Sequence, residues 1–428
     1  MLLRTGDAVS DGRARAALRE ALTRGPWLSL AGLVVTAGTS AALVYVYICG
    51  QYLGRPYPFS TFLYAPGDHF ADYYNVYAQA AAFRGASGDV VVYSPFLHAV
   101  MTVATALPAR VGFAALVLVF LATVAATFWI VSARSLAGVL PRLQAVVPLT
   151  LLSYPVLFAL DRGNLEMLVF VFVAAFLYLY CLRGSRWAWV PLALAIAAKY
   201  YWATLLVLPL LDRQYRQALL AFAGALVASA AGLILVIAAT GASLAGFVNV
   251  WATSLGGYGL WRGSVFYVHH AHGLWGVVML LNRATDYILS RQQHLEVLYL
   301  ALMAALFVLV VVVLRRGGYE TWEKVAVLVL CAIVMPFENA DYTLLEWMLV
   351  FALFAWRAPV GWRAGALAVL FSVTAVPFPY YYFPIVGRPD VGISTLIYPA
   401  ALVGAGMLIL TRPGRVRPDD PQPGEGCA

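Results

Sequence analysis

The amino-acid sequence predicts an all-α integral membrane protein that crosses the bilayer many times. Of its 428 residues, 63% are hydrophobic and only 11% are charged, whereas a soluble domain carries about 25% charged residues. The apolar runs are continuous and do not alternate with polar residues, as the strands of a membrane barrel do. Continuous runs favour helices, because a helix satisfies its own backbone hydrogen bonds inside the bilayer.

A helix needs about 20 apolar residues to span a bilayer. Runs near this length lie at roughly 27–48, 112–132, 143–160, 164–182, 218–240, 295–314 and 391–411. Shorter runs lie at roughly 325–336, 343–356 and 364–376. We expect one transmembrane domain over 27–411, because no other segment is long enough to hold a core of its own. The first run lacks a cleavage site and is interpreted as a retained span.

Arginines fall in short segments between the runs, as is typical of cytoplasmic loops. The arginine-rich segment 1–26 is therefore predicted to be cytoplasmic, and span one delivers a loop of about 49–111 to the outside. A single crossing over 188–211 would invert the later loops, whereas two short half-helices meeting at Lys199–Tyr200 keep them consistent. This topology has about 12 membrane elements, including short or broken ones, and both termini in the cytoplasm. Residues 412–428 form a predicted disordered tail.

Under this topology many polar residues converge on the outer face. Asp72 lies near the start of a predicted helix over 70–83, where a carboxylate could act as a general base toward a sugar hydroxyl. The alternative is a helix cap, a role that aspartate also fills. Asp68 follows Pro66 and Gly67 and has the pattern of a turn residue.

Two cations are candidates for binding a phosphate group. Arg162, in the polar turn DRGN at 161–164, has the forked donor geometry that suits phosphate; the alternative is a structural pair with Asp161. Glu166 follows about one turn into the next span, where an acid is costly and usually functional. Lys199 has no acid beside it in the sequence, so snorkelling to the surface and contact with a lipid phosphate both remain open.

Other polar motifs carry weaker signals. His269 and His270 belong to VHHAHG, which suits a polar loop or substrate contact better than a metal site. Glu338, Asp341 and Tyr342 belong to the predicted outer turn FENADY. Neither a metal nor another cofactor is predicted, and the four scattered cysteines show no C-x-x-C spacing. The net charge of +8 comes from arginines in loops and termini and does not indicate nucleic-acid binding.

Several short motifs, taken in order, resemble those of the GT-C glycosyltransferases and most closely glycosyltransferase family 87. They are D-x-x-x-V-Y-x-x-A from Asp72 to Ala80, V-V-V-Y-S-P-F ending at Phe96, the DRGN turn, A-A-K-Y-Y-W at 197–202, and P-x-x-x-x-D-Y from Pro336 to Tyr342. This family includes polyprenol-phosphate-mannose-dependent α-mannosyltransferases. The resemblance implies a GT-C-like fold and a catalytic aspartate in the first outer loop, at Asp72.

The resemblance and the residues together predict an inverting hexosyltransferase. The expected reaction moves mannose, or another hexose or pentose, from a polyprenyl-phosphate donor to a glycolipid or cell-envelope glycan. The expected location is the extracytoplasmic face of a bacterial plasma membrane, with membrane lipids as further partners. The predicted substrate-binding residues are Asp68, Tyr73, Asn75, Arg162, Asn164, Glu166, Lys199, His269, His270, Glu338, Asp341 and Tyr342.

Two alternatives belong to other functional classes. A lipid-linked-sugar flippase or transporter would also have broken helices and intramembrane charges. However, the polar residues gather on one face instead of at the midplane, and no inverted repeat is visible in the sequence. A non-catalytic subunit of an envelope-polysaccharide assembly complex is the second alternative.

Overall fold

The computed structural model describes residues 27–82, 93–241, 243–249, 251–253, 271–285, 295–337, 340–357, 359, 361–378 and 393–411. Within these ranges the regular elements are helices, apart from one isolated antiparallel bridge between Ala271 and Ala340. The predicted all-α class is confirmed. The predicted segments 1–26 and 412–428 lie outside the described residues.

Four helices are long and apolar enough to cross a membrane. They are α2 (Trp27–Tyr47), which continues as a π-helical turn to Tyr52, α5 (Ala109–Ser135), α11 (Tyr215–Thr240) and α15 (Leu295–Arg316). A fifth span results if α6 (Val139–Leu151) and α7 (Tyr154–Arg162) count as one helix, bent by 40°. Pro155 accounts for the break, because proline lacks the N–H that would continue the preceding helix. The count of about 12 membrane elements and the cytoplasmic termini stay predictions.

The remaining helices are shorter than a full crossing. They are α3 (Ala71–Ala82), α4 (Pro95–Ala104), α8 (Glu166–Leu177), α9 (Trp189–Ala198), α10 (Val207–Leu211), α14 (Leu274–Ala284), α16 (Thr321–Val334), α17 (Leu345–Arg357), α18 (Trp362–Thr374) and α19 (Ser394–Leu410). Three of them, α16, α17 and α18, match the shorter apolar runs in the sequence. By contrast, α4 and α14 were not predicted.

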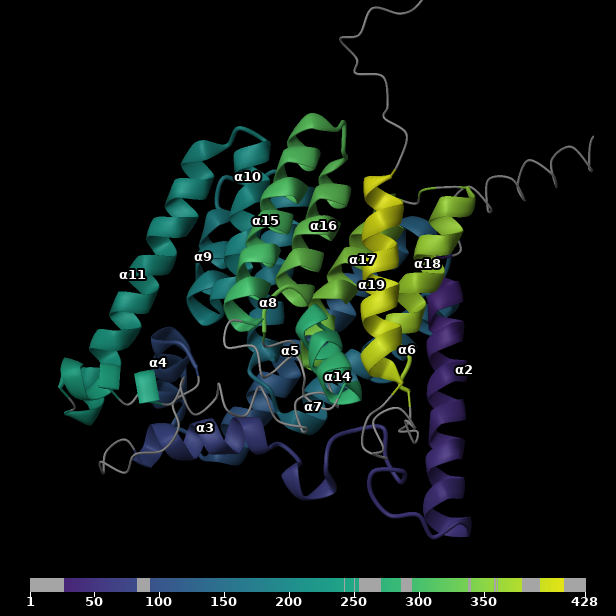
Figure 1. The fold of residues 1–428 in the computed structure, drawn as a ribbon, viewed down its shortest axis with the longest axis horizontal. Coiled ribbons are helices and arrows are strands. Elements are labelled where there is room, and N and C mark those ends of the chain that lie inside the picture. The colour runs from purple at the N-terminus through teal and green to yellow at the C-terminus, as the bar shows by residue number, and fades with distance from the viewer. Residues whose placement is uncertain are drawn as a thin grey trace, which may run out of the picture.

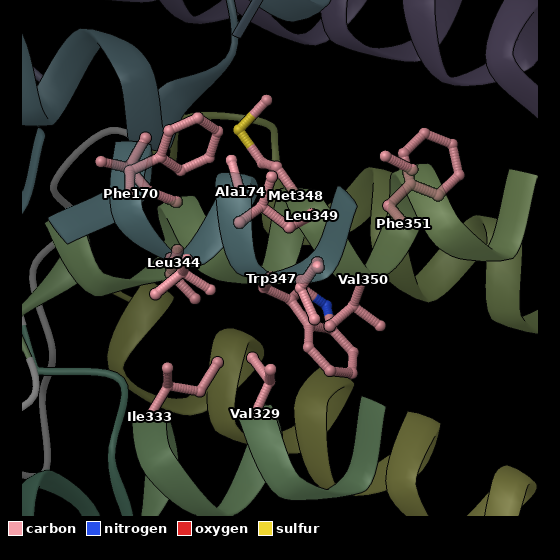
Figure 2. Close-up of a cluster of buried hydrophobic side chains, with 14 of the residues drawn as sticks. Phe170, Ala174, Val329, Ile333, Leu344, Trp347, Met348, Leu349, Val350 and Phe351 are labelled. Carbon is pink, nitrogen blue, oxygen red and sulfur yellow. The ribbon is translucent and has the colours of Figure 1, made fainter. Parts of the chain in front are cut away.

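Helix α17 lies in the centre of the bundle, in contact with α5, α8 and α16. Figure 2 shows Trp347 of α17 in a cluster of buried side chains that also contains Phe170 of α8 and Val329 of α16. A helix that is apolar on all sides is normally buried in this way. The first turn of α17 therefore brings a polar side chain, Glu346, into surroundings without water.

The two ends of the bundle differ in the elements and contacts that lie there (Figure 1). At one end Trp27 donates to the carbonyl of Pro359 at 3.0 Å, and Arg134 lies 4.6 Å from the ring centre of Trp356. We call this the far end; the start of α2 and the end of α19 both lie there. At the other end, α3 runs across the bundle instead of along it. We call this the site end.

The chain breaks at Lys199, where the sequence predicts two half-helices to meet. Helix α9 ends at Ala198, Lys199 is extended, and a 3₁₀ helix, Tyr200–Leu206, leads into α10. Helix α11 packs along α9 and α4. The break leaves the Lys199 side chain at a helix end, where it can reach a neighbouring element.

Candidate active site

The DRGN turn is the structural centre of the site. Helix α7 ends at Arg162, and Gly163 follows in the left-handed conformation with φ +63°. A Cβ at Gly163 would lie 3.1 Å from Cα of Phe70. Only glycine suits both this φ and this close approach, so the turn docks directly on the loop between α2 and α3.

Asp161 joins that loop to the turn by hydrogen bonds. Its carboxylate accepts a hydrogen bond from the backbone N–H of Tyr64 at 3.1 Å and contacts Nδ1 of His69 at 2.5 Å. Its carbonyl accepts from the N–H of Phe70 at 2.6 Å. Asp161 is buried, and these bonds give it a structural role. It does not pair with Arg162, the alternative left open by the sequence.

Asp72 occupies the first turn of α3 and bonds across to the DRGN turn. Its Oδ1 accepts a hydrogen bond from Nη2 of Arg162, and its Oδ2 accepts from Nδ2 of Asn164 at 2.5 Å. Both carboxylate oxygens are thus bound by residues about 90 positions away in the sequence. The fold has placed this carboxylate against the end of α7.

Arg162 is held from three sides. Its Nη1 donates to the carbonyl of Asp68 at 3.2 Å, and its guanidinium lies 4.1 Å from the ring centre of Tyr64. Burial raises the pKa of the Tyr64 phenol, and the neighbouring guanidinium opposes that rise. Tyr64 therefore stays a neutral aromatic platform for the arginine.

A second ion pair involves Glu166, which lies about one helical turn after Arg162 in the chain. Nζ of Lys199 pairs with Oε2 of Glu166, whose carboxylate also accepts from the hydroxyl of Tyr201 at 2.9 Å. The two pairs are linked by Asn164, whose Oδ1 accepts from the backbone N–H of Glu166 at 2.8 Å. The sequence offers Lys199 no neighbouring acid, but the fold supplies one from α8.

Aromatic and acidic side chains surround Lys199. The ring centre of Tyr342 lies 4.9 Å from Nζ, and the same tyrosine interacts electrostatically with Arg162. Tyr342 is thus near both cations. The fully buried Glu346 faces Glu166, and neither of its oxygens accepts a hydrogen bond from a described residue.

Asp341 belongs to a separate buried network. Its Oδ2 accepts from the hydroxyl of Tyr154 at 2.6 Å, and its Oδ1 lies 3.3 Å from Nδ1 of His272. Burial raises the pKa of the Asp341 carboxyl, and the bond with His272 opposes that rise. The network ties the turn that carries Tyr342 to α7.

The other predicted contacts fall in different places. Asp68 is exposed in the loop between α2 and α3, and Asn75 is exposed on α3. Tyr73 is buried, with its ring centre 5.1 Å from that of Phe113, so it packs in the core behind Asp72. Glu338, His269 and His270 lie outside the described residues.

Several site residues were missing from the predicted set: Tyr64, His69, Asp161, Tyr154, Tyr201, His272 and Glu346. The sequence did hold one signal for a pairing. A carboxylate inside a span requires a partner, so Glu166 implied a cation such as Lys199. His272 was part of the histidine motif. Among the described residues, no group of three or more His, Cys, Asp or Glu side chains is arranged to hold a metal ion.

The apolar helices and the charged cluster at one end define a polytopic membrane protein with a polar site. The model of glycosyltransferase family 87 matches residues 92–337, more than half of the chain. The chain therefore belongs to glycosyltransferase family 87 and is a membrane glycosyltransferase. The match contains Arg162, Glu166 and Lys199 and begins after Asp72. No curated protein and no solved structure matches the chain.

Proposed function

We propose that the protein transfers a sugar from a polyprenyl-phosphate donor to a glycolipid or envelope glycan, with Asp72 as the general base. One observation carries the proposal: the pair of Asp72 with Arg162 is linked through Asn164 to the pair of Glu166 with Lys199, so a carboxylate and two cations belong to one network. A base for the acceptor and cations for the leaving group are what such a transfer needs.

The cations favour a phosphate-bearing donor. Arg162 offers a planar fork of N–H donors, and Lys199 offers a compact positive charge. Both side chains are only 14% exposed, and charge interactions are stronger in such a setting than in water. A donor on a polyprenyl chain keeps its tail in the bilayer while its phosphate reaches these residues.

The residues present account for the proton and the leaving group of this transfer. The acceptor oxygen attacks the anomeric carbon while its proton passes to a carboxylate oxygen of Asp72. The bond between the anomeric carbon and the phosphate oxygen breaks, and the bonding electrons leave with the phosphate. Arg162 and Lys199 stabilise the negative charge that develops there. Attack opposite to the leaving group inverts the anomeric centre.

Two further residues act by positioning. Asn164 holds Oδ2 of Asp72 and is itself fixed by the N–H of Glu166. Glu166, held by Tyr201, fixes the ammonium of Lys199. We place the reaction at the extracytoplasmic face of a bacterial plasma membrane, since the arginines of 1–26 favour a cytoplasmic N-terminus.

The test is sugar transfer by the purified chain in lipid nanodiscs, with polyprenyl phosphates that carry labelled sugars. Asp72→Asn should lower the rate by about 10²–10⁴-fold while the protein keeps its thermal stability. Counterflow assays in vesicles address the transporter alternative. A folded Asp72→Asn protein that transfers sugar at the wild-type rate would refute the role of Asp72.

A further inference from the structure

Both cations proposed to hold the donor phosphate are already paired with carboxylates. Arg162 binds Asp72, and Lys199 binds Glu166. An incoming phosphate that takes the forked N–H donors of Arg162 therefore competes with a carboxylate for them. The competition is close, because arginine binds carboxylate and phosphate with the same forked geometry.

The two pairs differ in how readily they can open. The Glu166 side chain is 0% exposed, whereas that of Asp72 is 17% exposed. Removing Lys199 would leave Glu166 as an unpaired buried charge, and such changes are strongly destabilising. Asp72 would keep its bond from Asn164 and is partly exposed. The Asp72–Arg162 pair is the one that opens at lower cost.

We propose that donor binding exchanges the partner of Arg162: the phosphate takes the guanidinium and thereby releases Oδ1 of Asp72. This inference rests on the proposed function, in which Asp72 is the base. Without donor, Oδ1 of Asp72 accepts from Arg162 and Oδ2 from Asn164, so an acceptor hydroxyl must share its oxygen with one of these donors. With donor bound, Oδ1 becomes available and Asn164 still orients the carboxylate through Oδ2.

The exchange couples the two substrates. Lys199 remains on Glu166 and adds its charge to the phosphate site without changing partner. Arg162 changes partner while it keeps its contacts with the carbonyl of Asp68 and the ring of Tyr64. The base is thus ready only when a leaving group is in place.

The experiment is a double-mutant cycle on the binding of polyprenyl phosphate in nanodiscs, with the uncharged polyprenol as the lipid control. The four proteins are the wild type, Asp72→Asn, Arg162→Gln and the double variant. Removing the competing carboxylate should tighten phosphate binding about tenfold, the size of one charge-assisted hydrogen bond. The gain should vanish in the Arg162→Gln background, and polyprenol binding should stay constant.

Two variants make the cycle specific. Asp68→Asn removes a charge from the same loop, but Arg162 contacts only the backbone carbonyl of Asp68, so it should change affinity less than Asp72→Asn. Asp72→Ala serves if the asparagine variant does not fold. An unchanged affinity in both Asp72 variants overturns the exchange, and so does an equal gain with and without Arg162. Failure of the proposed function looks different: no protein of the set binds polyprenyl phosphate or transfers sugar from it.

Discussion

The two lysines of this chain form the same kind of group at opposite ends of the bundle. At the site end Lys199 pairs with Glu166, which accepts from the hydroxyl of Tyr201 at 2.9 Å. At the far end Lys324 pairs with Asp212 at 2.6 Å, and Tyr180 donates to the same aspartate at 2.8 Å. An acid, a lysine and a tyrosine are therefore not in themselves a mark of a site.

The surroundings distinguish the two groups. Asp212 is 19% exposed and joins the turn before α11 to the first turn of α16, as a structural clamp does. Glu166 is fully buried, lies beside a second acid, Glu346, and is linked through Asn164 to the pair of Asp72 and Arg162. The group around Lys199 therefore differs from that around Lys324 in being linked to a second ion pair.

The largest expected contrast is between Lys199→Met and Lys324→Met. The first should lower sugar transfer about 100-fold or more, because a cation that stabilises the leaving group is lost. The second should leave transfer near the wild-type rate and cost less stability than the first, since Asp212 is 19% exposed and keeps its bond from Tyr180, whereas Glu166 is 0% exposed. Transfer rates and thermal unfolding of the same preparations measure both.

Lys199→Met also leaves Glu166 unpaired, which would destabilise the fold by about 3–5 kcal/mol. The double variant Lys199→Met/Glu166→Gln removes that charge and should recover stability but not transfer. If transfer recovers with stability, Lys199 is a structural residue like Lys324, and the contrast between the two ends disappears.

The next contrast uses two glycines that both have positive φ. Gly163 at the site end has φ +63° and a close neighbour in Phe70, whereas Gly184 has φ +56° and nothing within 4 Å. Gly184→Ala should cost about 1–2 kcal/mol from the backbone alone. Gly163→Ala should cost more and lower transfer, because it separates the loop between α2 and α3 from the DRGN turn. Equal losses in thermal unfolding would show that the loop is not docked as described.

The smallest contrast concerns the two tyrosines. Tyr201→Phe and Tyr180→Phe each remove one hydroxyl bonded to a carboxylate, at a similar cost of about 1–3 kcal/mol. Only Tyr201→Phe should reduce transfer, by about tenfold in kcat with little change in KM, because Glu166 then holds Lys199 less firmly. A parallel fall in both variants would mean that the loss is one of stability alone.

The sequence predicted the helices well and the pairings poorly. Apolar runs located α2, α5, α11 and α15, because burial in lipid depends on composition and length. The break at Lys199 followed from loop charges. The partners of Asp72 did not follow, since they lie about 90 residues away and are set by how α3 packs across the bundle. Tyr201 was missed because no local pattern reports that its hydroxyl faces Glu166.

The contact between Gly163 and Phe70 also determines how the chain can be recombined with relatives. Phe70 is itself held in the left-handed region, with φ +59°, so two unusual backbone conformations meet at one point. A chimaera that exchanges the loop between α2 and α3 without the turn at 161–164 would join surfaces shaped for other partners. The unit of exchange is therefore discontinuous, and segments 64–72 and 161–166 should be transplanted together.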